Sequence, residues 1–78
     1  MTDASPTTLD LRGLKCPLPA LRTRKALARL AAGQTLVVEA TDPMAAIDIP
    51  HLVATGGDIL AATARDGDVL RFTIRKGG

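Results

Sequence analysis

Cys16 is the only cysteine in this 78-residue chain, and it lies in the run Lys15-Cys16-Pro17-Leu18-Pro19. Proline is tolerated in the first turn of a helix, because the N–H groups there have no intrahelical partner. We therefore expect a helix with Pro17 as its first residue and Cys16 at the cap position. A thiol placed there would face free backbone N–H groups and the positive end of the helix dipole, which favour the reactive thiolate.

The expected activation of this thiol is moderate. A helix N-terminus contributes about 0.3–1 kcal/mol to an exposed negative charge. Since one pKa unit corresponds to about 1.4 kcal/mol, the dipole alone shifts the thiol pKa by less than one unit. We expect Lys15 and Arg12 to support the thiolate by their charge. Pro17 and Pro19 are expected to support it by fixing the start of the helix beneath the sulfur.

Several reactions of a lone thiol are excluded or weakened by the rest of the sequence. A second cysteine that could resolve a disulfide within the chain is absent, and one Cys with one His is too small a set for a metal. His51 could serve as a base, but nothing in the sequence places it near Cys16, and we expect it to be structural. What remains is a thiol that receives a group and passes it on, such as a sulfur atom held as a persulfide. This chemistry needs an accessible sulfur and a docking surface, and it requires no cofactor and no metal.

The size and composition of the chain indicate one small domain. We expect this domain to span residues 7–78, after a frayed lead over residues 1–6. The formal net charge of +2 is too small to indicate nucleic-acid binding by itself. No apolar run reaches the roughly 18 residues of a membrane span, and the N-terminal residues do not resemble a signal peptide. With a single cysteine, the default compartment is a reducing cytoplasm.

The pattern of polar and apolar residues predicts the order β-α-β-α-β-β, a two-layer α/β sandwich with helices on one face of the sheet. The strands are expected over residues 7–11, 35–40, 58–65 and 69–75, and the first helix over residues 17–32 with Gly33 as its cap. The second helix should begin with Asp42 as its cap and Pro43 as its first residue, and should kink or restart at Pro50. Asp66-Gly67 predicts a tight hairpin between the last two strands.

The first helix is predicted to present different surfaces. Its core side should carry Ala20, Thr23, Leu27 and Leu30. A basic stripe of Arg22, Lys25 and Arg29 should lie on another side, with Leu18 and Leu21 exposed near the thiol. We interpret these last five residues as a surface for docking a partner protein. Solvated helix cations and isolated surface leucines are the plainer interpretation of the same pattern.

The sequence resembles the TusA/SirA-like sulfur-carrier family in several segments. The matching segments are residues 9–19 around the Cys-Pro-x-Pro motif, Arg24-Lys25, Asp42-Pro43, Asp48-Ile49-Pro50 and the final residues 74–78. The resemblance implies two helices on a four-stranded sheet, mixed in strand direction. It also implies that Cys16 carries a persulfide from a cysteine desulfurase or a rhodanese-like donor to an acceptor protein. The acceptor would belong to tRNA thiolation, sulfur oxidation or molybdenum-cofactor supply, and the chain would act with partner enzymes rather than alone.

The chain departs from the tRNA-thiolation members of that family at two positions. Leu18 stands where they have Glu, and Ile47 stands where they have a basic residue. Because both positions lie near the expected docking side, they bear on the choice of partner. The sequence does not reveal the donor, the acceptor or the oligomeric state.

Two alternative functions stay open at this point. The C-terminal Gly77-Gly78 is shared with ubiquitin-like carriers that hold sulfur as a thiocarboxylate, although a helix directly after the first strand is unlike them, and we expect a flexible end here. The second alternative is an RNA- or protein-binding regulatory module with an incidental cysteine. Its basic surface would combine the helix stripe with Arg71, Arg75 and Lys76. Direct nucleic-acid binding is not expected, because the single aromatic residue, Phe72, belongs to the predicted core.

Overall fold

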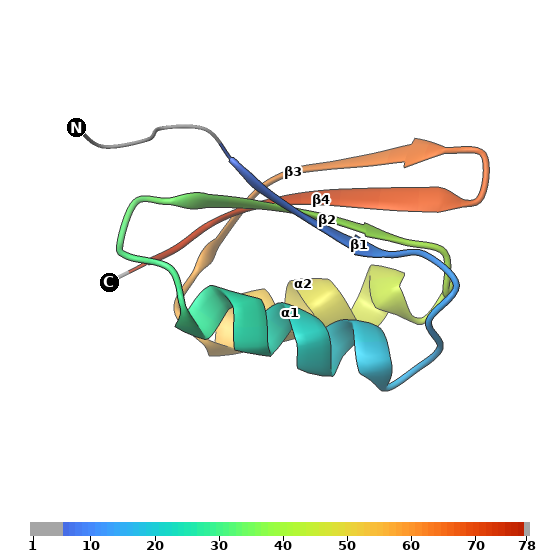
Figure 1. Ribbon diagram of the computed structural model, residues 1–78, viewed down its shortest axis with the longest axis horizontal. Coiled ribbons are helices and arrows are strands. Elements are labelled where there is room, and N and C mark those ends of the chain that lie inside the picture. The colour runs from blue at the N-terminus through green and yellow to red at the C-terminus, as the bar shows by residue number, and fades with distance from the viewer. Residues whose placement is uncertain (1–5, 78) are drawn as a thin grey trace.

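The computed structural model describes residues 6–77 and confirms the predicted fold class. The elements are β1 (Thr7–Leu11), α1 (Leu18–Ala28), β2 (Thr35–Ala40), α2 (Ala45–Thr55), β3 (Ile59–Asp66) and β4 (Val69–Arg75). Both helices lie side by side on one face of a single sheet (Figure 1). Residues 1–5 of the predicted frayed lead, and Gly78, lie outside the described residues.

The sheet has the strand order β1-β2-β4-β3 and is mixed, as predicted. β1 runs parallel to β2, whereas β4 is antiparallel to both of its neighbours. Leu11 and Ala40, the last residues of the two parallel strands, are paired in register. The chain therefore leaves β1 and β2 at the same edge of the sheet, and each exit leads into a helix. This juxtaposition brings the segment of Cys16 next to the segment of Asp42.

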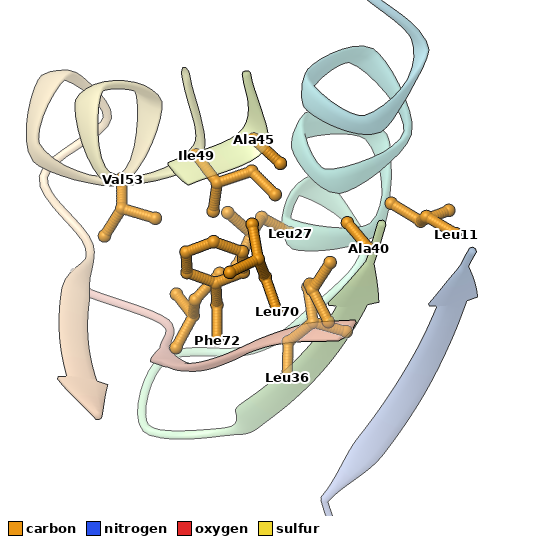
Figure 2. Close-up of a cluster of buried hydrophobic side chains, with 11 residues drawn as sticks. Leu11, Leu27, Leu36, Ala40, Ala45, Ile49, Val53, Leu70 and Phe72 are labelled. Atoms are coloured by element: carbon orange, nitrogen blue, oxygen red, sulfur yellow. The ribbon is translucent and has the colours of Figure 1, made fainter. Parts of the chain in front are cut away.

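The core follows from residue alternation in the two central strands. Leu36, Val38 and Ala40 of β2 are buried, and their β4 counterparts are also buried, while the residues between them are only half-buried. Leu11 of β1, Leu27 of α1 and three α2 residues spaced one turn apart complete the cluster (Figure 2). The buried β4 residues are Leu70, Phe72 and Ile74. The buried α2 residues are Ala45, Ile49 and Val53. The predicted one-sided core with Phe72 inside it is confirmed.

The opposite face of the sheet carries polar residues and no helix among the described elements. On this open face, Arg71 of β4 donates two hydrogen bonds to Glu39 of β2, the shorter being 2.9 Å from Nη2 to Oε2. Glu39 and Arg71 are cross-strand partners in the ladder. Arg71 is the only cation of β4 that lies directly opposite an acidic residue in the β2–β4 register.

Replacing Ile49 with alanine is expected to destabilise the domain by about 2–5 kcal/mol, because the lost side chain leaves a cavity in a fully buried site. Chemical denaturation followed by circular dichroism measures this change. Ile47→Ala is the matched control, since Ile47 lies in the same helix and is 64% exposed. It should change the free energy of unfolding by about 0.5 kcal/mol or less. Equal unfolding midpoints for the two variants would contradict the core placement.

Helix α1 is shorter than predicted at both ends. It begins at Leu18, with Pro17 as its cap residue, so the prediction of Cys16 as cap and Pro17 as first helical residue is wrong. It ends at Ala28, with Arg29 as its C-cap, because Leu30 N–H donates to Leu27 in a tighter turn. Gly33 has a positive φ of 87°, as a left-handed cap would, but it belongs to a separate turn leading into β2.

The core side of α1 agrees in part with the predicted face. Thr23 and Leu27 are buried, and Ala20 and Leu30 are half-buried. Pro19 is also buried and was missed, because its place in the first turn suggested only a role in starting the helix. The buried Thr23 hydroxyl donates to the Pro19 carbonyl at 2.7 Å, which satisfies it inside the core.

Helix α2 begins later than predicted and runs through Pro50 without a break. Its start is delayed because the N–H groups of residues 45–47 bond three residues back, and α-type bonding starts with Asp48. The predicted restart at Pro50 is wrong. Proline costs this helix one backbone hydrogen bond. The buried contacts of Ile49 and Val53, on either side of Pro50, hold both halves of the helix against the sheet.

Strand β3 differs from prediction by one residue, whereas β4 covers Val69–Arg75 as predicted. β3 covers Ile59–Asp66 rather than 58–65, and Asp66 pairs with Val69. The central residues of the hairpin are therefore Gly67 and Asp68 rather than Asp66 and Gly67, with Gly67 supplying the positive φ of 61°.

The chain after β4 is held in place at Gly77. Its N–H donates to Asp58 Oδ1 at 2.8 Å, and a Cβ at this position would meet the Gly57 carbonyl oxygen at 2.1 Å. Glycine therefore allows a close backbone approach, and the prediction of a flexible end is wrong for Gly77. Gly78 lies outside the described residues.

Candidate functional site

Cys16 lies exposed in the loop between β1 and α1, one residue before the helix cap. It precedes Pro17 through a cis peptide bond. The predicted accessibility of the sulfur is therefore confirmed, whereas its predicted position at the helix cap is not.

The start of α1 offers the sulfur fewer N–H groups than the sequence suggested. Pro17 and Pro19 have no N–H, and the Leu18 N–H donates to the Lys15 carbonyl at 2.9 Å. The prolines that start the helix thus remove the donors that would stabilise a thiolate. The prediction that free N–H groups surround the thiol failed for this reason.

Two carboxylates from the neighbouring segment contact Cys16 instead. The thiol donates to Asp48 Oδ2 on the first turn of α2, at 3.5 Å from Sγ. The backbone N–H of Cys16 donates to Asp42 Oδ2. Asp42 also accepts from the Met44 N–H at 3.1 Å through its other oxygen, so it fixes the α2 entry and the cysteine loop together. These contacts follow from the parallel pairing of β1 and β2.

These contacts reverse the expected direction of the thiol pKa. Desolvation is the largest cause that raises the pKa of Cys16, followed by the hydrogen bond to Asp48 and by the negative charges of Asp48 and Asp42. Each of these favours the neutral thiol over the thiolate. The prediction of a moderately activated thiolate in the free protein is therefore wrong.

The predicted cationic support for the thiolate is also placed differently. Arg12 donates to Asp10 through Nε at 2.8 Å and through Nη2 at 2.9 Å. Its guanidinium is therefore paired with a residue of β1. Its hydrogen bonds lower the pKa of Asp10 to about 2. Lys15 is exposed next to Cys16, and none of the side-chain contacts found over residues 6–77 joins it to the sulfur.

The predicted docking residues come together. A groove of about 560 Å³ runs along the side of α1 that faces β1. Its lining consists of Leu9, Leu18, Leu21, Arg22, Lys25, Ala26 and Arg29, which includes all five residues of the predicted docking surface. We call it the basic groove. Its lining combines apolar side chains with three cations, and it includes Leu18, two residues after Cys16 in the sequence.

Two further exposed apolar side chains near the sulfur come from the start of α2: Met44, which was missed, and Ile47, which was expected near the docking side. Met44 is the α2 cap residue and is 44% exposed, while Ile47 in the first turn is 64% exposed. On α1, Leu18 and Leu21 are 41% and 53% exposed. Four of the five large exposed apolar side chains among the described residues thus lie where the two helices begin. The departures from the family at positions 18 and 47 both fall within this set.

His51 and Arg24 lie at a different groove. It has a volume of about 410 Å³, lies between the two helices and is also lined by Leu52, Thr55 and Lys76. The expectation that His51 is not a base for Cys16 agrees with this position, since the contacts of the sulfur are with Asp48 and Asp42. The adjacent residues Arg24 and Lys25 line separate grooves.

The cations invoked for RNA binding lie on different surfaces. Arg71 is paired with Glu39 on the open face of the sheet, whereas the basic groove lies along α1 on the covered face. Over residues 6–77, no group of three or more metal-ligating side chains is placed to hold an ion. Nor is any described helix long and apolar enough to cross a membrane.

Residues 7–76 match the family described as "Sulfurtransferase TusA". The chain belongs to the TusA sulfurtransferase family. The match includes Cys16, both carboxylates that contact it and the whole basic groove. The resemblance noted from the sequence is therefore confirmed at the level of the family.

Relatives of this TusA-family chain agree with the assignment. It is 44% identical over 73 residues to YrkI of Bacillus subtilis (strain 168), a candidate sulfur carrier protein by its name, covering 94% of this chain and 97% of YrkI. It is 37% identical over 70 residues to YrkF of the same organism, also named as a candidate sulfur carrier, covering 90% of this chain but only 38% of YrkF. A crystal structure of a SirA-like protein from Desulfitobacterium hafniense superposes with a TM-score of 0.81 at 28% identity, covering 92% of this chain and 99% of that one. Family and relatives together support a sulfur-carrier role, which entails interaction with sulfur donors and acceptors.

One signal in the sequence could have located the missed carboxylates. If β1 and β2 are parallel neighbours, the segments that follow them must emerge at one edge of the sheet. Cys16 follows β1 by five residues, and Asp42 and Asp48 follow β2 by two and eight residues. Strand pairing, which the residue pattern alone did not give, was the missing step.

Proposed function

We propose that this TusA-family protein carries sulfur as a persulfide on Cys16, between a donor enzyme and an acceptor protein. The observation that carries the proposal is a single, exposed thiol two residues before Leu18, which lines the basic groove. An exposed sulfur suits exchange between macromolecules, because the reacting sulfur of each partner must reach it directly.

In the proposed loading step, Cys16 first releases its proton to solvent. Its thiolate attacks the outer sulfur of a persulfide on a donor cysteine. The new S–S bond forms on Cys16 as the donor's S–S bond breaks, and the donor cysteine leaves as a thiolate. Delivery is the same reaction in the other direction: an acceptor thiolate attacks the outer sulfur, and Cys16 leaves as a thiolate.

The partners follow from this chemistry and from the family. We propose a cysteine desulfurase or a rhodanese-like enzyme as donor, with a cytoplasmic acceptor in tRNA thiolation, sulfur oxidation or molybdenum-cofactor supply. The protein would act with these enzymes and needs neither cofactor nor metal of its own. The basic groove is the proposed docking surface for at least one partner, because it combines three cations with exposed leucines and includes Leu18, two residues after Cys16.

Incubation with a cysteine desulfurase and cysteine should add about 32 Da, the mass of one sulfur atom, to the intact protein. A thiol reductant should remove the added mass as hydrogen sulfide, because a persulfide is reducible. Peptide mapping after alkylation should place the sulfur at Cys16. A protein that gains no mass with a desulfurase or a rhodanese-like donor, or gains mass that resists reduction, would contradict persulfide carriage.

A further inference from the structure

Two carboxylates lie beside Cys16. Asp48 from α2 accepts the thiol hydrogen bond, and Asp42 from the α2 entry accepts the backbone N–H of the same residue. Of the cations nearest in sequence, Arg12 is engaged by Asp10, and Lys15 stands exposed. The first turn of α1 has no acidic residue. The first cation of helix α1 is Arg22, which lines the basic groove.

This arrangement disfavours the thiolate, which is the form of Cys16 that a carrier needs in order to attack a donor sulfur. The carboxylate of Asp48 favours the protonated form and repels negative charge on the sulfur. A protonated thiol is a poor nucleophile and is also protected from oxidation and alkylation, which depend on thiolate. The free protein therefore holds its sulfur in a less reactive state.

We propose that Asp48 is a positioning residue that keeps Cys16 protonated in the free protein and selects partners bearing a cation beside their reactive sulfur. The proposal rests on the proposed persulfide function, and it adds the chemistry of the partner that this function requires. A partner cation beside Asp48 would neutralise the carboxylate, so that the proton leaves and the thiolate forms only within the complex. The exposure of Cys16 leaves room for such a group beside the sulfur.

Charge selection can be tested without any natural partner. Symmetrical disulfides react with Cys16 thiolate to form a mixed disulfide on Cys16, and they release one half as a thiolate. Cystamine carries a positive charge next to each sulfur half, 3,3′-dithiodipropionate carries a negative charge, and bis(2-hydroxyethyl) disulfide is neutral. Exchange rates with the three probes, measured at one pH and low ionic strength, give a selectivity for charge.

Two variants separate the role of Asp48 from a general change in charge. Asp48→Asn removes the carboxylate charge beside the sulfur while keeping an oxygen acceptor. Asp58→Asn is the matched control, because it removes the same charge beside β3 and retains the oxygen that accepts the Gly77 N–H. Circular dichroism and thermal unfolding establish that both variants keep the fold.

In the wild type and in Asp58→Asn, cystamine should react several-fold faster than dithiodipropionate. In Asp48→Asn this ratio should fall by about threefold or more, and the rate of alkylation by iodoacetamide at pH 7 should rise by about three- to tenfold, since a tenfold change in thiolate corresponds to one pKa unit. The pH profile of alkylation should move to lower pH in the same variant. An unchanged ratio together with an unchanged pH profile in Asp48→Asn would overturn the proposal.

These measurements also separate this inference from the proposed function. Failure of sulfur loading with intact charge selectivity would reject persulfide carriage and leave the role of Asp48 standing. Normal loading with no charge selectivity would reject the role of Asp48 alone.

Discussion

Replacing Cys16 with serine should abolish sulfur loading completely. The chain has no second thiol, and a serine hydroxyl cannot form a persulfide at neutral pH. With a cysteine desulfurase and cysteine, the variant should remain at its unmodified mass while the wild type gains one sulfur. Intact-protein mass spectrometry of both, loaded in parallel, measures the difference.

The serine variant is also expected to fold normally, which makes its loss of function interpretable. Cys16 is exposed and outside the core, and its backbone N–H keeps the bond to Asp42 after substitution. A serine hydroxyl can also donate to Asp48 in place of the thiol. Unfolding measurements should therefore show a change of about 0.5 kcal/mol or less. If the variant gains the same mass as the wild type, the sulfur is attached elsewhere and the assignment to Cys16 is wrong.

The strands could be predicted closely because local pattern determines them. In β4, the apolar residues Leu70, Phe72 and Ile74 alternate with polar residues, and this period of two fixes both the strand and its buried face. The ends of the helices were predicted less well. Pro17 and Pro43 mark where helices can begin, but α1 begins one residue after Pro17 and α2 begins two residues after Pro43. Tertiary packing also overrode local preference at Pro50, where Ile49 and Val53 hold the helix to the sheet.

The exposure of the thiol and the grouping of the five expected docking residues were predicted correctly, whereas the environment of the sulfur was not. Leu18, Leu21 and the basic stripe are close in sequence on one helix, so helical periodicity alone brings them together. Asp42 and Asp48 are 26 and 32 residues from Cys16, and only the parallel pairing of β1 with β2 brings them near. A long-range contact therefore raises the pKa of the thiol, which the local motif alone suggested would be lowered.

This difference changes how the sulfur-carrier chemistry is understood. A thiolate held ready at a helix start would react with any electrophile of suitable size. Under the proposed role of Asp48, a thiol held neutral beside this carboxylate would depend on its partner for deprotonation, and this would link docking to reactivity.

Reversing the charge of Arg22, Lys25 and Arg29 together to glutamate should slow sulfur transfer by about tenfold or more at low ionic strength. The three cations line one groove beside Leu18 and Leu21, so a partner docked there would meet three negative charges instead. The loss should shrink as salt is added, because screening weakens the repulsion. Initial rates of loading from the donor, measured across a salt series, test this expectation.

The matched control for that variant reverses three cations outside the groove: Arg65, Arg75 and Lys76. Each substitution changes the charge by two, so both triple variants go from a formal net charge of +2 to −4. All three residues of the groove set are exposed, so the fold should survive, and circular dichroism checks this directly. If the initial rate of sulfur transfer falls equally in both variants, the effect comes from net charge and the groove has no special role. A slow groove variant beside a fast control variant would locate docking at the basic groove.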